Sequence, residues 1–158
     1  MLTNVDGTEE LGGLARARAR DYETKTVSPS AVAEHQEAGW EVSKKNAKSI
    51  RLSRPKPHGM LLEDRVWTLL YRMRFRFLSG RGGAQLQLNA GEDSPKTQID
   101  VVAIDDEVAI AIECKSAEKP AKRPQFQQEL GKHALIRDRF TTAARKLFEP
   151  QSKRLVGI

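Results

Sequence analysis

Two acidic residues and a lysine lie at the ends of the two most apolar segments of the chain. Asp100 belongs to the first segment, residues 98–104, while Glu113 and Lys115 close the second, residues 108–115. Carboxylate oxygens are hard ligands that suit Mg²⁺, and an ammonium group beside them can orient a water molecule and offset the charge of a phosphate. Phosphodiester hydrolysis requires these components, so the three residues form the first candidate site.

Strand geometry decides whether these side chains can meet. Because side chains alternate along a strand, Glu113 and Lys115 point the same way. A two-residue turn at Asp105–Asp106 makes Asp100 and Glu113 diagonal neighbours on one face, with backbones about 7–8 Å apart. A three-residue turn would put Asp100 on the other face, and a four-residue turn would set it directly opposite Glu113. The two-residue and four-residue turns both allow the carboxylates to share one cation.

A plainer reading is an exposed hairpin face with ordinary charges, on which Glu113 and Lys115 form a salt bridge. For an isolated D…ExK pattern, this reading outnumbers true sites by about ten to one, because the spacing is loose and the residues are common. Two features favour a site here. The carboxylates end apolar strands, where a surface charge is least expected, and the small Ala109 and Ala111 leave space beside them.

A helix before the hairpin is expected to complete the site. Apolar residues recur at helical spacing over about 60–74 and predict an amphipathic helix, with Glu63 and Asp64 in its first turn. On a lone helix, these two acids are explained by the helix dipole or by solubility. Weak strands are expected at 75–78 and 85–88. One long or two shorter helices are expected between Pro124 and about Phe148.

The segments Gln98–Val102 and Ala111–Ser116 together resemble the D-x(n)-E-x-K signature of the PD-(D/E)xK, or restriction-endonuclease-like, nucleases. Residues 59–70 are similar to the helix of the Mrr-type and Holliday-junction-resolvase members, which commonly supply an early glutamate there. The resemblance covers roughly residues 58–158. It implies an α/β fold with an αβββαβ core, in which helices flank a mixed sheet.

The resemblance also implies roles for the site residues. Asp100 and Glu113 would bind Mg²⁺, for which Mn²⁺ can substitute, with the backbone carbonyl of Cys114 as a third ligand. Lys115 would orient the attacking water, and Glu63 would be an auxiliary ligand or base. Cleavage would leave 5′-phosphate and 3′-hydroxyl ends.

The expected function is therefore that of a metal-dependent deoxyribonuclease, an endonuclease serving restriction, phage defence or repair. DNA is the expected partner, RNA stays open, and paired cutting of a duplex would favour a homodimer. The alternative is an inactive nuclease-fold module for nucleic-acid binding or complex assembly. Two departures from the family stand out: Asp100 lacks a preceding proline, and Arg74 stands where a glycine often precedes the aromatic residue.

The remainder of the chain is expected to surround this core loosely. Residues 1–30 are predicted to be a flexible tail, because glycines, serines and a proline interrupt them and little apolar material recurs. Residues 31–57 predict a small appendage, with a helix over about 31–38 and a β-hairpin formed by 40–42 and 49–52. The last residues look like the opening of another strand, which favours a fragment of a longer protein with further domains beyond Ile158.

Composition indicates a globular protein in a reducing cytoplasm. Of the 158 residues, 39% are hydrophobic and 30% are charged, and no apolar run approaches the length of a membrane span, so no membrane partner is expected. The polar, acidic first ten residues do not look like a secretory signal. The single cysteine, Cys114, excludes an internal disulfide and is predicted to pack in the core. The net charge of +6 permits binding to a polyanion without demonstrating it.

Overall fold

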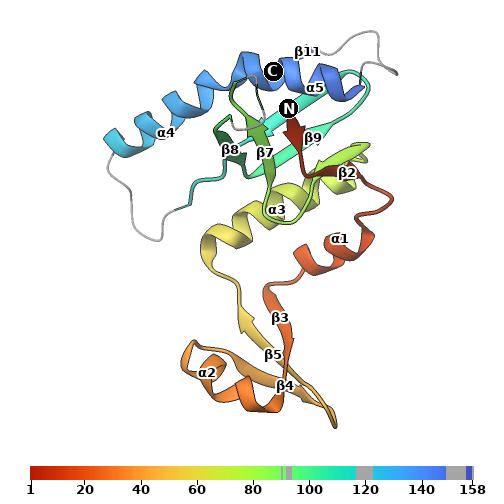
Figure 1. The fold of residues 1–158 in the computed structure, drawn as a ribbon, viewed down its shortest axis with the longest axis vertical. Helices are drawn as coiled ribbons and strands as arrows, with labels where there is room; N and C mark the ends of the chain where they lie inside the picture. The colour runs from red at the N-terminus through yellow and green to blue at the C-terminus, as the bar shows by residue number, and fades with distance from the viewer. Residues whose placement is uncertain (90, 92–93, 117–122, 149–155, 158) are drawn as a thin grey trace.

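The computed structural model describes residues 1–89, 91, 94–116, 123–148 and 156–157. Within these residues the chain is mixed α/β, with five α-helices and eleven short strands arranged in three sheets (Figure 1). No described helix is long and apolar enough to cross a membrane.

A five-stranded sheet forms the centre of the fold. Its order is β11-β10-β9-β6-β2, and the strands span Val5–Gly7 (β2), Phe77–Ser79 (β6), Val101–Ile104 (β9), Val108–Ile112 (β10) and Val156–Gly157 (β11). The pairs are antiparallel except for β10 and β11, which run parallel. All four residues of β9 are fully buried. This strand therefore has packed layers on both of its faces.

Helices cover the two faces of this sheet. On one face lie α1 (Gly12–Arg18) and α3 (His58–Arg72), whose Trp67 and Leu70 pack with Val101 and Ala103 of β9. On the other face lies α5 (Arg137–Phe148), and α4 (Arg123–Leu135) precedes it. The expected helix over 60–74 is present but begins two residues earlier, at His58. Of the two alternatives for the C-terminal region, two helices are present, and the first begins at Arg123.

A second sheet of three strands lies beside the first, in the order β1-β7-β8. Its strands span Leu2–Thr3 (β1), Ala84–Gln87 (β7) and Lys96–Ile99 (β8). The strands expected at 75–78 and 85–88 correspond to β6 and β7, each within two residues.

The prediction of a flexible tail over residues 1–30 is wrong. Strand β1 pairs with β7, β2 pairs with β6, and Leu2 and Leu11 are buried in the two halves of the core. The tail was predicted because the strands are only two and three residues long, too short to show a periodic pattern. Their stability comes from partners 70 or more residues away, which local composition does not reveal.

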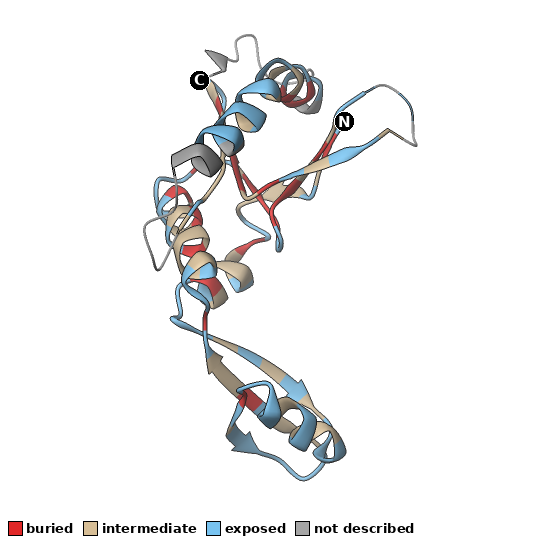
Figure 2. Cartoon of the chain, turned by 90° about the vertical axis from the view of Figure 1, so that its left-hand side faces the viewer, coloured by how far each residue is buried: buried red, intermediate tan, exposed pale blue. Residues whose placement is uncertain are grey.

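The third sheet and a small helix form a separate projection, here called the module, residues 22–55 (Figures 1 and 2). The sheet order is β3-β5-β4, with strands Tyr22–Val27 (β3), Glu41–Lys45 (β4) and Ile50–Pro55 (β5), and α2 spans Val32–Glu37. The expected helix and hairpin are present, and β3 adds a strand from the region expected to be a tail. Leu52 and Trp40 are its buried residues, with Lys25 and Arg54 against the Trp40 ring.

Candidate functional site

The register of the β9–β10 hairpin sets Asp100 opposite Glu113. Ile104 pairs with Ala109 and Val101 pairs with Ile112, so the next position outward brings the two acids together. Four residues, 105–108, separate the last register pair, Ile104 and Ala109, and the last of them already belongs to β10. The Asp105 N–H donates a hydrogen bond of 2.8 Å to the Val108 carbonyl. The two-residue turn at Asp105–Asp106 is therefore not formed. The four-residue alternative is present, and it keeps both acids on one face.

The Asp100 carboxylate is fixed by the neighbouring strand. The backbone N–H of Cys114 donates a hydrogen bond of 2.8 Å to Asp100 Oδ2. On the other side, Gly83 packs so closely that a Cβ atom there would lie 2.3 Å from the Ile99 carbonyl oxygen. Gly83 also has φ +77°, a conformation that favours glycine. The position of Asp100 is therefore set by backbone contacts on both sides.

Glu113 and Lys115 point the same way, as strand alternation predicts. Lys115 Nζ lies 2.6 Å from Glu113 Oε1, and the two side chains are 38% and 24% exposed, respectively. This is the salt bridge of the plainer reading as well as the pair that a nuclease site would need. The ion pair is common to both readings.

Glu63 joins this group from α3. It lies in the second turn of the helix, because α3 starts at His58, so the helix-dipole explanation for Glu63 and Asp64 loses its basis. The first turn of α3 lies against the end of β10, where a Cβ atom on Gly59 would be 3.6 Å from Ser116 Oγ. Burial raises the pKa of Glu63, and so do the negative charges of Asp100, Asp64 and Glu113, while Arg18 opposes the shift.

Cys114 is a packing residue. Its side chain lies against the part of the core under α3, as predicted. Burial raises the pKa of its thiol to about 11, and the charges of Asp100, Glu63 and Glu113 add to the rise against the opposing effect of Lys115. The thiol is therefore protonated at neutral pH, which makes it a poor nucleophile.

The donor chemistry at this end of the hairpin fits a hard divalent cation. Asp100, Glu113 and the Cys114 carbonyl supply oxygen atoms, and the acids raise the pKa of Glu63 through concentrated negative charge, which a cation would relieve. Among the described residues, no three His, Cys, Asp or Glu side chains are already gathered into a metal site.

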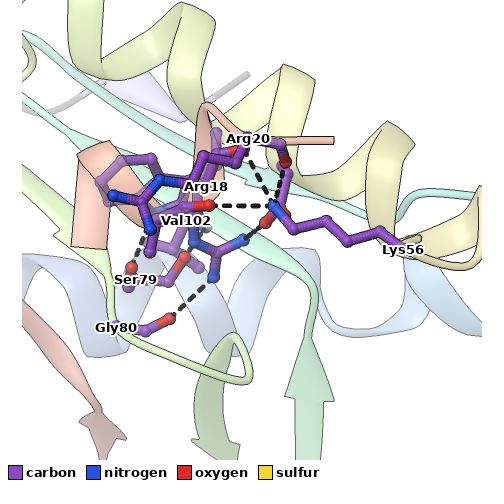
Figure 3. A network of polar contacts seen from close by, with 9 residues as sticks. Arg18, Arg20, Lys56, Ser79, Gly80 and Val102 are labelled. Atoms are coloured by element: carbon purple, nitrogen blue, oxygen red, sulfur yellow. Dashed lines mark hydrogen bonds and ion pairs between the residues drawn. The ribbon is translucent and has the colours of Figure 1, made fainter. Parts of the chain in front are cut away.

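A buried ionic network, which the sequence did not predict, holds α3 in place (Figure 3). Asp64 lies between Arg18 and Lys56, with both nitrogen–oxygen distances 2.7 Å and all three side chains no more than 8% exposed. Lys56 also donates to the carbonyls of Ala17 and Arg18, 3.0 and 3.2 Å away. The network therefore ties the end of α1 and the end of the module to α3.

The network continues to the central sheet. Arg18 donates to the Gly80 carbonyl at 3.1 Å and lies over the Trp67 ring, 5.1 Å from its centroid. Trp67 Nε1 donates to the Ser79 carbonyl at 2.7 Å, and Ser79 Oγ accepts from the Val102 N–H at 3.1 Å. Helix α3 carries Glu63, and β9 follows Asp100. These contacts therefore fix the positions of the two acids relative to each other.

The spacing of the first helix contained a signal for this network. Leu11, Leu14, Ala15 and Arg18 stand at helical spacing i, i+3, i+4 and i+7, and the first three pack against the core. An arginine at the last position of such an apolar face indicates a buried charge, which requires a partner. The repeated Ala–Arg pattern hid this period.

No protein-family model, no curated protein and no solved structure matches this chain. Its function is therefore inferred from its own residues.

Proposed function

We propose that this chain is a Mg²⁺-dependent DNA endonuclease of the PD-(D/E)xK type. The observation that carries the proposal is the placement of Asp100 directly opposite Glu113, with Lys115 ion-paired to Glu113 at 2.6 Å. Glu63 lies close enough for its pKa to respond to both acids. These four residues, from three segments of the chain, are the ones that support the proposal.

The order of elements supports the same proposal. Helix α3 is followed by the antiparallel strands β6, β9 and β10, then by helices α4 and α5, and then by β11 parallel to β10. With β7 and β8 set aside and α4 and α5 taken together, this order is compatible with the αβββαβ core that the resemblance implies. Strands β7 and β8 form an excursion between β6 and β9.

In this proposal Asp100, Glu113 and the Cys114 carbonyl hold Mg²⁺ or Mn²⁺. When bound, the ion polarises a phosphoryl oxygen and makes a water molecule more acidic. The chain's own groups do the remaining work. The Cys114 N–H keeps Asp100 turned toward the segment that follows β10, and the Lys115 ammonium group orients water and offsets phosphate charge. Burial and the neighbouring acids raise the pKa of Glu63, which makes it a stronger base than an ordinary glutamate.

A cleavage assay tests the proposal directly. Supercoiled and linear DNA are incubated with the chain in Mg²⁺, in Mn²⁺ and in EDTA, and nicking is followed on gels. The proposal expects metal-dependent nicking that falls by about 100-fold or more in Asp100→Asn, Glu113→Gln and Lys115→Ala. Glu107→Gln is the matched control, because this exposed acid lies at the turn, at the other end of the same hairpin.

Two outcomes would argue against the enzyme. Equal nicking by wild type, Asp100→Asn and Glu113→Gln would mean that the activity comes from elsewhere. DNA binding without nicking in either metal would favour the second candidate, a nuclease-fold module that binds nucleic acid without cutting it. Parallel reactions with RNA and a molecular-mass measurement in solution test the substrate and the proposed homodimer.

A further inference from the structure

The two faces of the module sheet differ in chemistry. One face carries Leu52, which is fully buried. Its register partner, Lys25, lies 3.1 Å from His35 of α2 and stands over the Trp40 ring, so α2 and Trp40 lie on this face. On the other face, register places Thr24 beside Ser53 and Thr26 beside Arg51. This second face, here called the open face, has no described element packed over it.

Two cations stand side by side on the open face. Lys44 of β4 is the register partner of Arg51 of β5, and both residues are exposed. Like charges directly opposite each other on neighbouring strands destabilise a sheet. In the described part of the chain, neither side chain has an ion-pair partner. The module thus holds a repulsive pair that a bound anion would relieve.

A shallow hollow on the open face is lined by basic and hydroxyl side chains. Its lining includes Arg20, Thr24, Ser43, Lys44, Arg51 and Ser53. Arg20 lies over the ring of Tyr22, 5.9 Å from its centroid. One acid, Glu41, is also on this face, paired with Ser53, but it does not line the hollow.

These side chains fit the phosphate backbone of a nucleic acid better than they fit a protein or a membrane surface. Arg, Lys, Ser and Thr provide most contacts to phosphate oxygens in protein–DNA complexes. A protein interface would need an apolar or aromatic centre, and a membrane surface would need apolar side chains to insert, whereas Tyr22 is the single aromatic residue in this hollow.

We propose that the open face of the module binds the phosphate backbone of DNA. The choice of DNA rests on the proposed nuclease function. An adjoining hollow shares Arg20, Tyr22 and Thr24 with the first and extends to Arg81 and Glu63. A backbone bound along the open face therefore continues toward the candidate site, so the module positions the substrate for the core.

Fluorescence anisotropy of a labelled DNA duplex tests this binding with the full chain in EDTA, where cleavage does not interfere. The open-face variant is Lys44→Gln/Arg51→Gln. The matched control is Lys45→Gln/Lys48→Gln, which removes the same charge from the same hairpin; Lys45 pairs with Ile50 and so alternates to the other side. The slope of log binding constant against log salt concentration is negative, and its magnitude should fall by about 1.8 in the open-face variant, because each phosphate contact contributes about 0.9.

The control should keep the wild-type slope. Arg20→Gln alone should reduce the magnitude of the wild-type slope by about 0.9. Thermal melting of the open-face variant at or above the wild-type temperature shows that it is folded, as expected when a repulsive pair is removed. Equal slopes in wild type, open-face variant and control would overturn the inference. So would binding of polyglutamate that matches DNA binding at the same salt concentration.

The two proposals can fail separately. DNA binding that depends on the open face, without metal-dependent nicking, would leave this inference standing and remove the nuclease proposal. The opposite result is nicking that is lost in Lys115→Ala, together with nicking and DNA binding that are unchanged in the open-face variant. It would support the nuclease proposal and remove this inference.

Discussion

Asp64 and Lys56 form a buried ion pair, with 2.7 Å between Oδ2 and Nζ, at the point where the module meets helix α3. Arg18 holds the other carboxylate oxygen at the same distance. Asp64 is adjacent to Glu63 in the sequence. The conformation of the candidate site therefore depends on a charge network that takes no part in the proposed chemistry.

Removing the central charge of this network should destabilise the chain strongly. Asp64→Ala leaves Arg18 and Lys56 buried without a counter-charge, which costs about 3–5 kcal/mol in the free energy of unfolding. The matched control is Asp106→Ala, which breaks the exposed pair with Arg76 and should cost less than about 1 kcal/mol. Urea unfolding measures both. A similar small loss in each variant would show that the network contributes no more than a surface pair.

Two adjacent glycines allow the cost of backbone strain to be measured separately from the cost of a steric clash. Gly82 and Gly83 have φ +79° and +77°, but a Cβ atom on Gly82 meets nothing within 4 Å, whereas one on Gly83 lies 2.3 Å from the Ile99 carbonyl oxygen. Gly82→Ala should cost about 1 kcal/mol, and Gly83→Ala should cost clearly more, because the backbone beside Asp100 must also move. Thermal denaturation compares them. Equal losses would mean that the contact at Gly83 is easily relaxed.

Arg74 occupies a backbone conformation that suits glycine. Its φ is 66°, just after the end of α3, where glycine commonly terminates a helix. Arg74→Gly should therefore stabilise the chain by up to about 1 kcal/mol. The control is Arg72→Gly, inside the helix, which should destabilise it by about 1 kcal/mol. A loss of stability in Arg74→Gly would indicate that contacts of the arginine side chain stabilise the fold by more than its backbone strain destabilises it.

The raised pKa of Glu63 predicts a pH-dependent stability. A carboxyl group whose pKa is higher in the folded chain favours folding below its ordinary value of 4.5 and loses that contribution as pH rises through the folded value. In EDTA, the melting temperature of Glu63→Gln should therefore exceed that of wild type by a margin that grows as pH rises from 4 to neutrality. Melting temperatures across this range test it. A constant difference at every pH would mean that Glu63 ionises normally.

Sequence patterns predicted the hairpin and the side on which Glu113 and Lys115 lie better than the elements around them. Glu113, Lys115 and Cys114 follow from alternation along one strand, which is a local rule. The position of Asp100 depended on the turn, in which four residues separate Ile104 from Ala109. Several turn lengths were open from the sequence, and each would have placed Asp100 differently.

The first thirty residues show where local reasoning fails. Two-residue and three-residue strands carry no periodic signal, and Arg18 looked like one member of a basic run. Its burial depends on Asp64 and Gly80, which lie 46 and 62 residues further along the chain. Long-range partners of this kind cannot be inferred from a single sequence without a pattern that marks both ends.

The pairing of Tyr22 with Pro55 has a consequence for how such a chain can change. The module leaves the core and returns to it at neighbouring points, as an insertion would. Its length and surface can therefore vary, or be exchanged for another insertion, without altering the path of the strands that carry Asp100 and Glu113. Substrate preference and catalytic chemistry would then evolve on separate parts of one chain.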